Sequence, residues 1–499
     1  MAEQKSLQDW QQLAKSLNIR GQAFIDGHYV DAASGATFDT VNPANGHTLA
    51  AVAATDSEDV DRAVAAARRA FDRGHWSKMA PRDRKAIMLR FADLIEQHTD
   101  ELALLETMDM GKPIADSTAI DIPGTARCLA WYGEAIDKIY DEVAPTGPTE
   151  LGMITREPVG VVACVVPWNF PLLMAAWKLG PALAAGNSVI LKPSEKSPLT
   201  AIRIAELAAE AGLPEGVLNV LPGMGATAGK SLALHTDVDC IAFTGSTAVG
   251  KLILQYAGQS NMKRVWLECG GKSPNIVLAD CPDLDKAAAA AASGIFFNQG
   301  EMCSAASRLL VEASIKEPFL EKLIAAGQQM QPGDPMDPAS PMGAIVDGIQ
   351  FDTVMGYIAK GRDEGATVRM GGEQLLKDTG GWFVAPTVFD DVSNDMAIAQ
   401  QEIFGPVLAT ITFSDPDEAL RMANDIPYGL AAAIWTSDLR KAHRFARELR
   451  AGTVWVNCYD MGDLSVPFGG FKESGNGRDK SLHALDKYVE LKTTWIDLS

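Results

Sequence analysis

Two short phrases of the chain carry a thiol and a carboxylate of the kinds that do covalent chemistry. Cys303 ends the run Phe297–Cys303, and Glu268 opens the run Glu268–Gly271. A cysteine attacks a carbonyl well only as a thiolate, and a free thiol has a pKa of about 8.5, so its site must stabilise the anion or supply a base. A carboxylate can activate water to hydrolyse a thioester. The two phrases therefore predict a cysteine nucleophile with a carboxylate base.

Both residues also have a plain structural interpretation. Cys303 could be a small buried apolar side chain, and Glu268 could be a solvated carboxylate at the end of a strand. Gly300 and Ser304 favour chemistry because small neighbours allow the backbone to approach a reacting centre. Glu301 would raise the pKa of the thiol if it faced inward, so we expect it to point away.

Five further motifs follow in order along the chain. They are Pro167–Pro171, Lys192–Glu195, Phe243–Thr247, Glu402–Pro406 and Pro467–Gly470. With the phrases around Cys303 and Glu268, they resemble the NAD(P)-dependent aldehyde dehydrogenases from near the start of the chain to its end. The resemblance is specific because seven phrases stand in the matching sequence.

The resemblance implies catalytic roles for three side chains. Cys303 would be the nucleophile, Glu268 the base that activates water, and Asn169 the donor to the oxyanion together with the Cys303 backbone N–H. Asn169 could instead belong only to a rigid turn between two prolines. Family members that pass the acyl group to coenzyme A usually lack the glutamate, so Glu268 favours a free acid as product.

The resemblance also implies NAD as cofactor, with NADP as an alternative. Glu195 would meet the adenine-side ribose and repel a 2′-phosphate. Gly245 and Ser246 would offer backbone N–H groups to the pyrophosphate, although a plain capped helix explains them equally well. The expected cofactor residues are Trp168, Lys192, Glu195, Gly245, Ser246, Glu402 and Phe404.

A narrower resemblance points to bacterial dehydrogenases of polyamine and arginine breakdown, which oxidise γ-glutamylamino- and guanidinobutyraldehydes. It rests on Met262–Glu268 and Ser474–Leu485. It implies an aliphatic substrate with an amino, guanidino or γ-glutamylamino end. A broad-specificity or betaine- or semialdehyde-type dehydrogenase is an alternative, and a non-catalytic structural member of the family is a rival of another class.

The same resemblance supplies expected substrate residues. Asp121, Asp460 and Asp463 would lie at a channel mouth, although they could equally be solvated charges of an acidic chain. Gly124 and Gly462 would leave the passage wide. Apolar walls are expected from Phe170, Met174, Trp177 and Phe297, and a proton path from Lys178 and Asp479.

Apolar periodicity predicts the elements that hold these residues. Short apolar runs at 161–166, 188–191, 217–221, 240–243 and 265–267 alternate with helical patterns, which predicts a parallel sheet covered on both faces. The patterns indicate an α/β protein of two domains, and the resemblance implies their roles: a Rossmann-like NAD-binding domain (1–140 and 160–270), an α/β catalytic domain (271–484) and a small β oligomerisation element (141–159 and 485–499). Asp26-Gly27 predicts an early hairpin. Ser57 is expected to cap a helix, and another begins near Asp283.

Composition narrows the partners. A net charge of −20 would repel nucleic acid and anionic membranes. The seven cysteines contain no CxxC pair, which argues against a disulfide framework and against a zinc site. The histidines do not show the HExxH spacing that would indicate a metal site. The first residues show no secretory signal, so we expect a cytoplasmic enzyme that acts on a small-molecule aldehyde. In the family such strands pair subunits, and their unpaired edges give a physical reason for a homo-oligomer. The resemblance implies a dimer of dimers, although the sequence does not distinguish a dimer from a tetramer.

Overall fold

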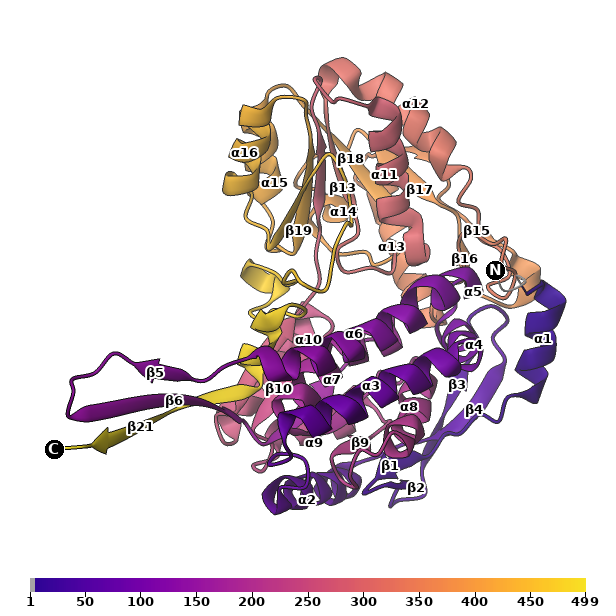
Figure 1. The fold of residues 1–499 in the computed structure, drawn as a ribbon. Coiled ribbons are helices and arrows are strands. Elements are labelled where there is room, and N and C mark those ends of the chain that lie inside the picture. Colours follow the sequence, from indigo (N-terminus) through magenta and orange to yellow (C-terminus); the bar gives the residue numbers. More distant parts are fainter. Residues whose placement is uncertain (1–4) are drawn as a thin grey trace.

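Two seven-stranded sheets and a projecting arm organise residues 5–499, the part of the chain that the computed structural model describes (Figure 1). The first sheet uses strands from residues 23–268, and the second uses strands from residues 274–456. Figure 1 shows the two α/β bodies one above the other, with the arm reaching sideways from the lower body. The expected α/β class, with a Rossmann-like body, is confirmed.

The first sheet contains all the strands that apolar runs predicted between residues 161 and 267. Strands β7 to β11 pair in parallel, and the hairpin β1–β2 adds to one edge in the antiparallel sense around Asp26 and Gly27, both of which have positive φ. The order is β11 (Arg264–Glu268), β10 (Cys240–Thr244), β7 (Val161–Val165), β8 (Ser188–Lys192), β9 (Leu218–Val220), β1 (Ala23–Ile25) and β2 (His28–Val30).

Burial on both faces explains why β7 reads as a continuous apolar run. Val162 and Cys164 pack into one core, whereas Val161 and Ala163 pack into another on the opposite face. Parallel strands need such cover because their crossover helices lie on the sheet faces. The first core takes side chains from α3 (Pro81–Gln97), α4 (Thr99–Met110), α6 (Ile122–Ala135), α7 (Pro171–Ala185) and α8 (Leu199–Glu210), and the second from α2 (Ser57–Arg73), α9 (Lys230–Leu234) and α10 (Thr247–Gln259).

Strand order reverses at β7, and this sets where ligands can bind. The chain runs from β7 to β8 and β9 on one side and then returns to place β10 on the other side of β7. In open α/β sheets the crevice at the carboxyl ends of such strands is where ligands bind. The loop containing Asn169 follows β7, and Glu268 ends β11, so both lie at this edge.

Two local expectations are refined. The helix expected after Ser57 is α2, but its N-cap is Asp56, whose side chain accepts from the Glu58 N–H at 3.0 Å. The helix expected near Asp283 is α11 (Leu284–Phe296), and Asp283 caps it. Shorter N-terminal elements are α1 (Leu7–Ser16), β3 (Thr37–Val41), β4 (Thr48–Ala53), α5 (Ile114–Asp116) and the π-helical turn η1 (Ser117–Asp121).

The second sheet is parallel except at β14. Its order is β14 (Thr367–Met370), β17 (Thr387–Asp390), β18 (Val407–Phe413), β13 (Arg308–Glu312), β12 (Pro274–Val277), β19 (Ala431–Trp435) and β20 (Thr453–Val456). Helices cover both faces: α11 and α12 (Lys316–Gly327) pack on one, and α13 (Gly348–Asp363), α14 (Ala397–Gln400), α15 (Pro416–Asn424) and α16 (Leu439–Glu448) on the other. A small hairpin joins β15 (Gln374–Leu375) and β16 (Phe383–Val384).

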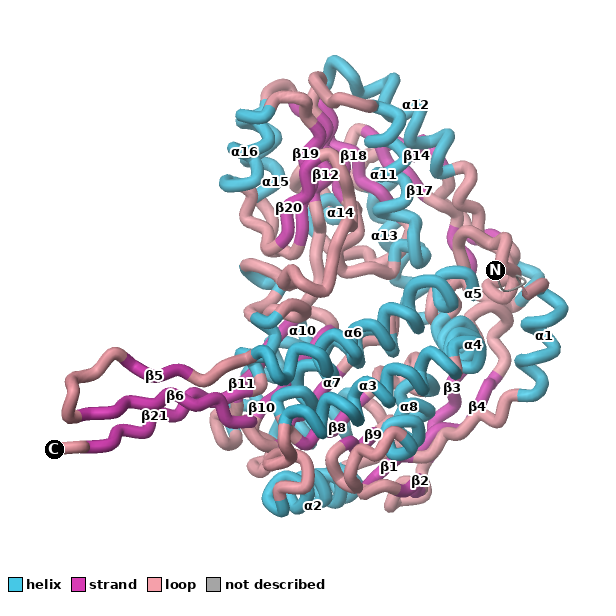
Figure 2. Tube along the Cα trace, in the orientation of Figure 1, coloured by secondary structure: helices cyan, strands magenta, loops and turns pink. Residues whose placement is uncertain are grey.

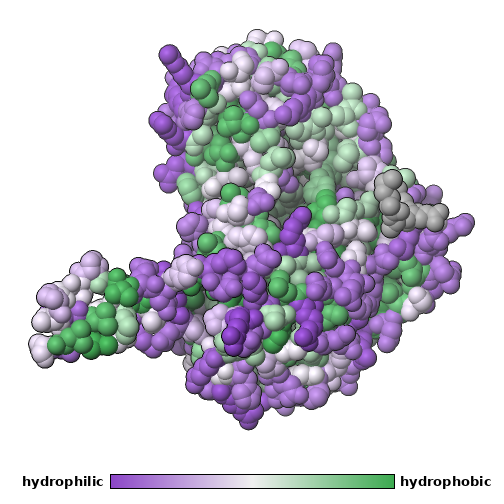
Figure 3. Space-filling model, viewed as in Figure 1, coloured by the Kyte–Doolittle hydropathy of each residue, from purple (hydrophilic) through white to green (hydrophobic). Residues whose placement is uncertain are grey.

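The arm is an antiparallel sheet of three strands. β6 (Glu150–Pro158) lies between β5 (Glu142–Ala144) and β21 (Val489–Asp497), so strands far apart in sequence lie side by side (Figure 2). Apolar side chains gather on the exposed arm (Figure 3), where Val143 is 70% exposed and Trp495 is 60% exposed.

The segment after β20 returns to the first body. Leu485 and Tyr488 are buried in the core beneath the first sheet, and the Tyr132 hydroxyl donates to the Ser481 carbonyl at 3.0 Å. This segment includes the 3-10 turn η8 (Leu482–Lys487). Among the described residues, no helix has both the length and the apolar character that a membrane crossing needs.

Candidate active site

A glycine pair brings the ends of both bodies together. Gly270 and Gly271 follow β11, and a Cβ on Gly270 would lie 1.9 Å from a Glu402 carboxylate oxygen. A Cβ on Gly271 would lie 2.6 Å from the Cys303 carbonyl oxygen. The Gly271 N–H donates to Glu402 at 3.1 Å. Glycine at these two positions therefore allows Glu268, Cys303 and Glu402 to share one site.

Strained backbone presents Cys303. Asn298 and Gln299 both have positive φ, at 49° and 55°, and Gly300 follows at 72° against the Gly405 carbonyl. Residues held in this conformation cost of order 1–3 kcal/mol each and persist where the surroundings fix them. The turn ends at a half-buried Cys303.

The surroundings of the Cys303 thiol favour its protonated form. Burial is the main reason that the pKa of Cys303 is raised, and the carboxylates of Glu402, Glu268 and Asp460 raise it further. The Ser304 N–H opposes this rise only in part. A base or a bound cation must therefore help to form the thiolate.

Asn169 is held beside the cysteine turn. Its side-chain amide donates to the Glu301 carbonyl at 2.8 Å, and the Asn298 amide donates to the Asn169 carbonyl at 3.1 Å. An asparagine side chain has two N–H donors, so one remains for another acceptor. The sequence-predicted oxyanion donor is therefore anchored to the turn that carries the predicted nucleophile, two residues before Cys303.

Glu301 is buried yet turned to other partners, as expected. Its carboxylate accepts from the Val346 N–H at 3.0 Å and lies 3.5 Å from the Gln299 amide nitrogen. Burial raises its pKa well above the usual range, and it is not among the groups that perturb Cys303.

Glu268 lies in a pocket of glycines without a hydrogen-bond partner for either carboxylate oxygen. One oxygen is 2.6 Å from the Cβ position of Gly469 and 3.1 Å from that of Gly477. Burial raises its pKa well above the usual range, Asp479 adds to the rise, and Lys487 and Lys178 oppose it. A carboxylate with a raised pKa accepts a proton from water more readily than an ordinary one, as a general base requires.

The expected proton path forms a buried ion pair. Lys178 lies 3.1 Å from Asp479, and both side chains are 1% exposed. Asp479 also pairs with Lys487, to which the sequence assigned no role.

The cofactor candidates line the carboxyl edge of the first sheet. Lys192 is buried at the end of β8 and pairs with Glu195 at 3.1 Å. Burial lowers the pKa of Lys192; the pKa of Glu195 is also lowered, because Lys192 and backbone N–H groups outweigh the effect of its own burial. Ser246 caps α10, accepting from the Val249 N–H at 3.3 Å, so the capped-helix interpretation of Gly245 and Ser246 also holds.

A dinucleotide fits these surroundings. Cβ atoms at Gly225 and Gly229 would meet nothing within 4 Å, so the first turn before α9 faces open space. Met224 and Val249 expose apolar surface near the same helices, which suits a flat base. Trp168 packs edge-on against Phe404 with ring centroids 5.1 Å apart. Burial raises the pKa of Glu402 to about 7, although the hydrogen bond from the Gly271 N–H and the charge of Lys272 both lower it.

The aromatic residues predicted to line a substrate channel form two ring pairs, one of which includes Phe468. Phe170 stacks on Phe297 at 6.2 Å, and Trp177 meets Phe468 edge-on at 5.5 Å. Met174 is buried in the same core. Gly124 is buried, and a side chain there would meet Leu173 at 3.1 Å.

The placement of Asp121 at a channel mouth is wrong. Asp121 is fully buried in η1 and pairs with Lys112 at 2.9 Å. Glu106 lies 3.7 Å from the same ammonium, which also stands 4.1 Å from the centre of the Phe170 ring. Burial raises the pKa of Asp121. Asp121 therefore belongs to a buried ion cluster behind Phe170 and cannot meet a substrate as a rim charge.

Asp460 and Asp463 are exposed and share a cation. Lys480 stands 5.2 Å from the Trp177 ring centre and 5.6 Å from that of Phe468. Its ammonium is 3.2 Å from the Cβ position of Gly462. Surrounding protein raises the pKa of Asp460 to about 6, and Lys480 opposes the rise. The entrance thus carries charges of both signs.

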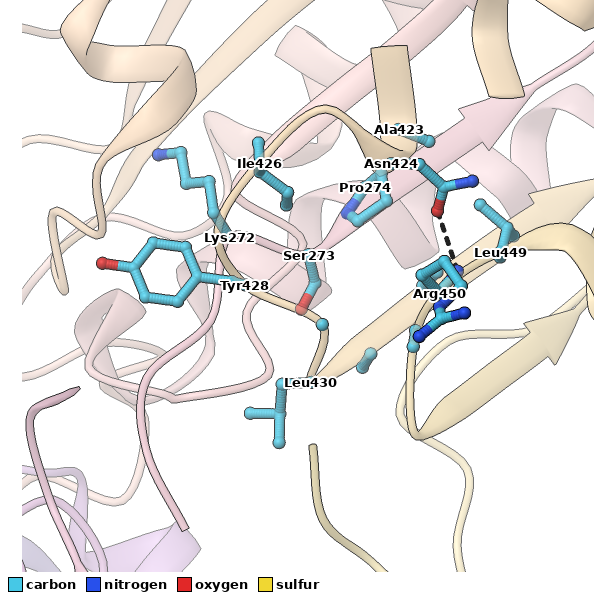
Figure 4. A pocket seen from close by; sticks show the side chains of 14 residues that line it. Lys272, Ser273, Pro274, Ala423, Asn424, Ile426, Tyr428, Leu430, Leu449 and Arg450 are labelled. Atoms are coloured by element: carbon cyan, nitrogen blue, oxygen red, sulfur yellow. Dashed lines mark hydrogen bonds between the residues drawn. The ribbon is translucent and has the colours of Figure 1, made fainter. Parts of the chain in front are cut away.

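A small cavity adjoins the segment that follows Gly271. It has a volume of about 10 Å³, room for one water, and is lined by Lys272, Tyr428 and Arg450 (Figure 4). The Lys272 ammonium is buried without a hydrogen-bond partner, and burial lowers its pKa to about 7. Figure 4 shows its side chain extending beside the Tyr428 ring.

Several residues at the site escaped sequence reasoning. Phe468 belongs to the motif Pro467–Gly470, but sequence reasoning assigned it no role. An aromatic side chain inside a family motif is the signal that could have marked it as a site residue. Lys480 and Lys487 fall in a polar stretch where lysines look like ordinary surface charge. Only their contacts distinguish them.

Known proteins agree with this geometry. The model of the aldehyde dehydrogenase family matches residues 29–494, and the chain belongs to that family. It is an oxidoreductase that acts on aldehydes with NAD(P)+.

Three relatives illustrate the range of similarity. The NADP/NAD-dependent aldehyde dehydrogenase PuuC of Escherichia coli (strain K12) is 57% identical over 489 residues, 98% of each chain. The P. syringae AldA indole-3-acetaldehyde dehydrogenase, solved with NAD+ and IAA, is 64% identical with a TM-score of 0.99, covering 99% of this chain and 100% of that one. The γ-glutamyl-γ-aminobutyraldehyde dehydrogenase of Burkholderia cenocepacia J2315 is 64% identical with a TM-score of 0.98 and the same coverage.

Proposed function

We propose that the protein oxidises an aliphatic aldehyde with a charged far end to its carboxylic acid, with NAD+ or NADP+, in polyamine or arginine breakdown. The names of PuuC, of the Burkholderia enzyme and of a 52% identical aminoacetaldehyde dehydrogenase from Pseudomonas aeruginosa support this class. The observation that carries the proposal of oxidation is the shared site of Cys303, Asn169 and Glu268.

The three side chains account for the steps. After losing its proton, the Cys303 sulfur bonds to the carbonyl carbon, and the new oxyanion accepts from the Asn169 amide and the Cys303 N–H. NAD(P)+, when bound, would accept the hydride from the carbon attached to the Cys303 sulfur, and that carbon would then be the acyl carbon of a thioester on Cys303. Glu268 takes a proton from water as the water oxygen attacks the thioester, and the acid leaves with the thiol restored.

The entrance supports a substrate with both charges at its far end. Lys480 stands over the rings of Trp177 and Phe468 without a carboxylate within 4 Å among the described residues, and it lies near enough to Asp460 to act on the pKa of that carboxylate. A γ-glutamylamino group carries an ammonium and a carboxylate on one carbon. It can therefore complement Asp460 and Lys480 together, whereas a guanidinium can use only the carboxylates.

A substrate panel tests this proposal. We expect kcat/KM for γ-glutamyl-γ-aminobutyraldehyde to exceed that for hexanal, and the ratio to fall about tenfold in Lys480→Met and in Asp460→Asn. Asp285→Asn is the control, because Asp285 is 79% exposed and pairs with Lys322 on the surface of the second body. An unchanged ratio in both test variants, or a preference for hexanal, contradicts the charged-end substrate.

An aromatic aldehyde is a second candidate. The indole-3-acetaldehyde dehydrogenases at 64% identity and the paired rings of Phe170 and Phe297 favour it. Indole-3-acetaldehyde therefore belongs in the same panel. A higher kcat/KM for it than for the γ-glutamylamino aldehyde, insensitive to Lys480→Met, favours this candidate.

The arm supports assembly of two or more copies. β5 and β21 form the edges of the described arm, and Val143, Leu491 and Trp495 expose apolar surface there. Such edges and patches favour pairing with another chain. We propose a dimer of dimers in the cytoplasm, where the free cysteines would stay reduced. Light scattering that shows a monomer contradicts the assembly.

A further inference from the structure

A buried carboxylate held between two lysines lies behind Glu268. Asp479 is 3.1 Å from Lys178, which projects from α7, and its other oxygen pairs with Lys487 at the end of η8. The three side chains are between 1% and 3% exposed. A lysine is rarely buried unless it is paired, so two on one carboxylate call for a reason.

We infer that Lys487 is a positioning residue, which fixes Asp479 beside Lys178 and balances the negative charge that Glu268 carries when it acts as the base. This inference rests on the role of Glu268 in the proposed function. It concerns a residue to which the expected proton path assigned nothing.

Charge counting gives the first reason. Ionised Glu268 and Asp479 contribute two negative charges, and Lys178 and Lys487 contribute two positive ones, so the buried set is neutral only when both lysines are present. An unbalanced buried charge is costly and is avoided by a change of protonation. Without Lys487, the same set would be negative whenever Glu268 is ionised, and Glu268 would keep its proton to higher pH.

The remaining neighbours do not replace Lys487. Arg478 also lowers the pKa of Glu268, but less than Lys487 and Lys178 do, and its guanidinium donates to the carbonyls of Gly470 and Gly477. Lys480 interacts with Asp460 and Asp463 more strongly than with Asp479. Burial raises the pKa of each neighbouring thiol and phenol, which keeps these groups neutral. These neutral groups are Cys128 and Tyr132 of α6, Cys164 of β7, Cys240 of β10, Cys269 and Cys303 near Glu268, and Tyr488.

Geometry gives the second reason. Asp479 and Phe468 exchange two backbone hydrogen bonds, at 2.7 and 2.8 Å, which close the loop that carries Gly469 and Gly477 against Glu268. By holding Asp479, Lys487 therefore also fixes the wall of the pocket around the base. Lys487 itself is anchored because the Cys240 thiol donates to its carbonyl at 3.7 Å.

The pH dependence of deacylation tests the inference. The acyl-enzyme is formed in a rapid burst of NADH, and its decay is followed across the acidic and basic ranges in wild type, Lys487→Met, Lys487→Arg and Asp479→Asn. In wild type the decay rate falls at acidic pH as Glu268 gains its proton, and this fall is the acidic limb of the profile. We expect the acidic limb to lie at higher pH in Lys487→Met, and a movement by one pH unit makes decay on the limb about tenfold slower. In Lys487→Arg, which keeps the positive charge, the limb should return to its wild-type position. Asp479→Asn leaves the set with an excess positive charge, so its limb moves to lower pH.

A double variant separates charge from fold. Lys487→Met with Asp479→Asn restores neutrality, so its limb returns toward that of wild type although two buried side chains are lost. Lys492→Met, which removes an exposed lysine paired with Glu157, is the matched control. If Lys487→Met does not fold, the pH profiles of Asp479→Asn and of the double variant decide.

Two outcomes overturn the inference. In the first, the acidic limb lies at the same pH in wild type and in all variants; in the second, it moves in the same direction in Lys487→Met and in Asp479→Asn. Glu268→Gln tells this failure from failure of the proposed function. If that variant accumulates acyl-enzyme while the limbs coincide, Glu268 is the base and only the role of Lys487 is wrong. If it accumulates none at normal turnover, the proposed mechanism itself is wrong.

Discussion

Cys303 lies among carboxylates, whereas Glu268 lies beside two lysines. Glu402, Glu268 and Asp460 all disfavour the Cys303 thiolate, while Lys178 and Lys487 favour the ionised form of Glu268. Both groups must lose a proton to act, and burial raises the pKa of both. The difference teaches that the cations around Glu268 oppose the effect of burial, whereas the carboxylates around Cys303 add to it, so the thiolate depends more on what a bound ligand changes.

Removing the nucleophile should have the largest effect. We expect Cys303→Ala to lose at least about 10³-fold in aldehyde oxidation, because no C–S bond can form, while NAD+ binding measured by titration is retained. Cys281→Ala is the control, since Cys281 is a free, half-buried cysteine at the start of the turn before α11. If Cys303→Ala turns over near the wild-type rate, Cys303 is not the nucleophile.

Removing the base should have a smaller effect that falls on a different step. Glu268→Gln keeps the shape of the side chain but cannot accept a proton, so we expect deacylation to slow by about 10²- to 10⁴-fold. The burst of NADH should remain, and quenched flow should recover the acyl-enzyme. Loss of the burst instead of the later phase shows that Glu268 serves the thiol rather than water.

The smallest effect should come from one carboxylate near the thiol. The negative charge of Asp460 raises the pKa of Cys303, so Asp460→Asn lowers that pKa and increases the thiolate fraction at a given pH below it. We expect alkylation of Cys303 by iodoacetamide in mild alkali to be about twofold faster, since a pKa lower by one full unit would give tenfold. Asp463→Asn is the control, and equal rates in wild type and Asp460→Asn contradict the electrostatic difference.

Local patterns were enough to predict the first sheet. The runs near Val161, Ser188 and Cys240 became parallel strands because a strand buried on both faces must be apolar at every position. Asp26-Gly27 became a hairpin turn because both residues adopt positive φ there. That Cys303, Asn169 and Glu268 lie together was predictable for a similar reason, since each stands in a short phrase typical of the family.

Long-range charge pairing could not be predicted. Asp121 was expected at a surface because nothing local shows that Lys112 and Glu106 fold onto it in a buried cluster. Lys178 and Asp479, which meet across 301 residues of sequence, were expected together only through the family resemblance, and nothing pointed to Lys487, which joins them from a stretch that looks solvated. Such pairs depend on how the bodies pack, which periodicity does not encode.

The pairing of β21 with β6 has a consequence for biosynthesis. Lys492 on β21 and Glu157 on β6 are 335 residues apart, so β6 emerges from the ribosome long before its neighbour exists. Lys487 lies just before β21, and the wall of the Glu268 pocket is therefore completed by the same late segment that covers the open edge of β6. A nascent chain lacking this segment would contain Cys303, but the pocket around Glu268 would be incomplete and one edge of β6 would be unpaired. Such an edge can pair with other chains, so the nascent chain would depend on chaperones until the last strand is made.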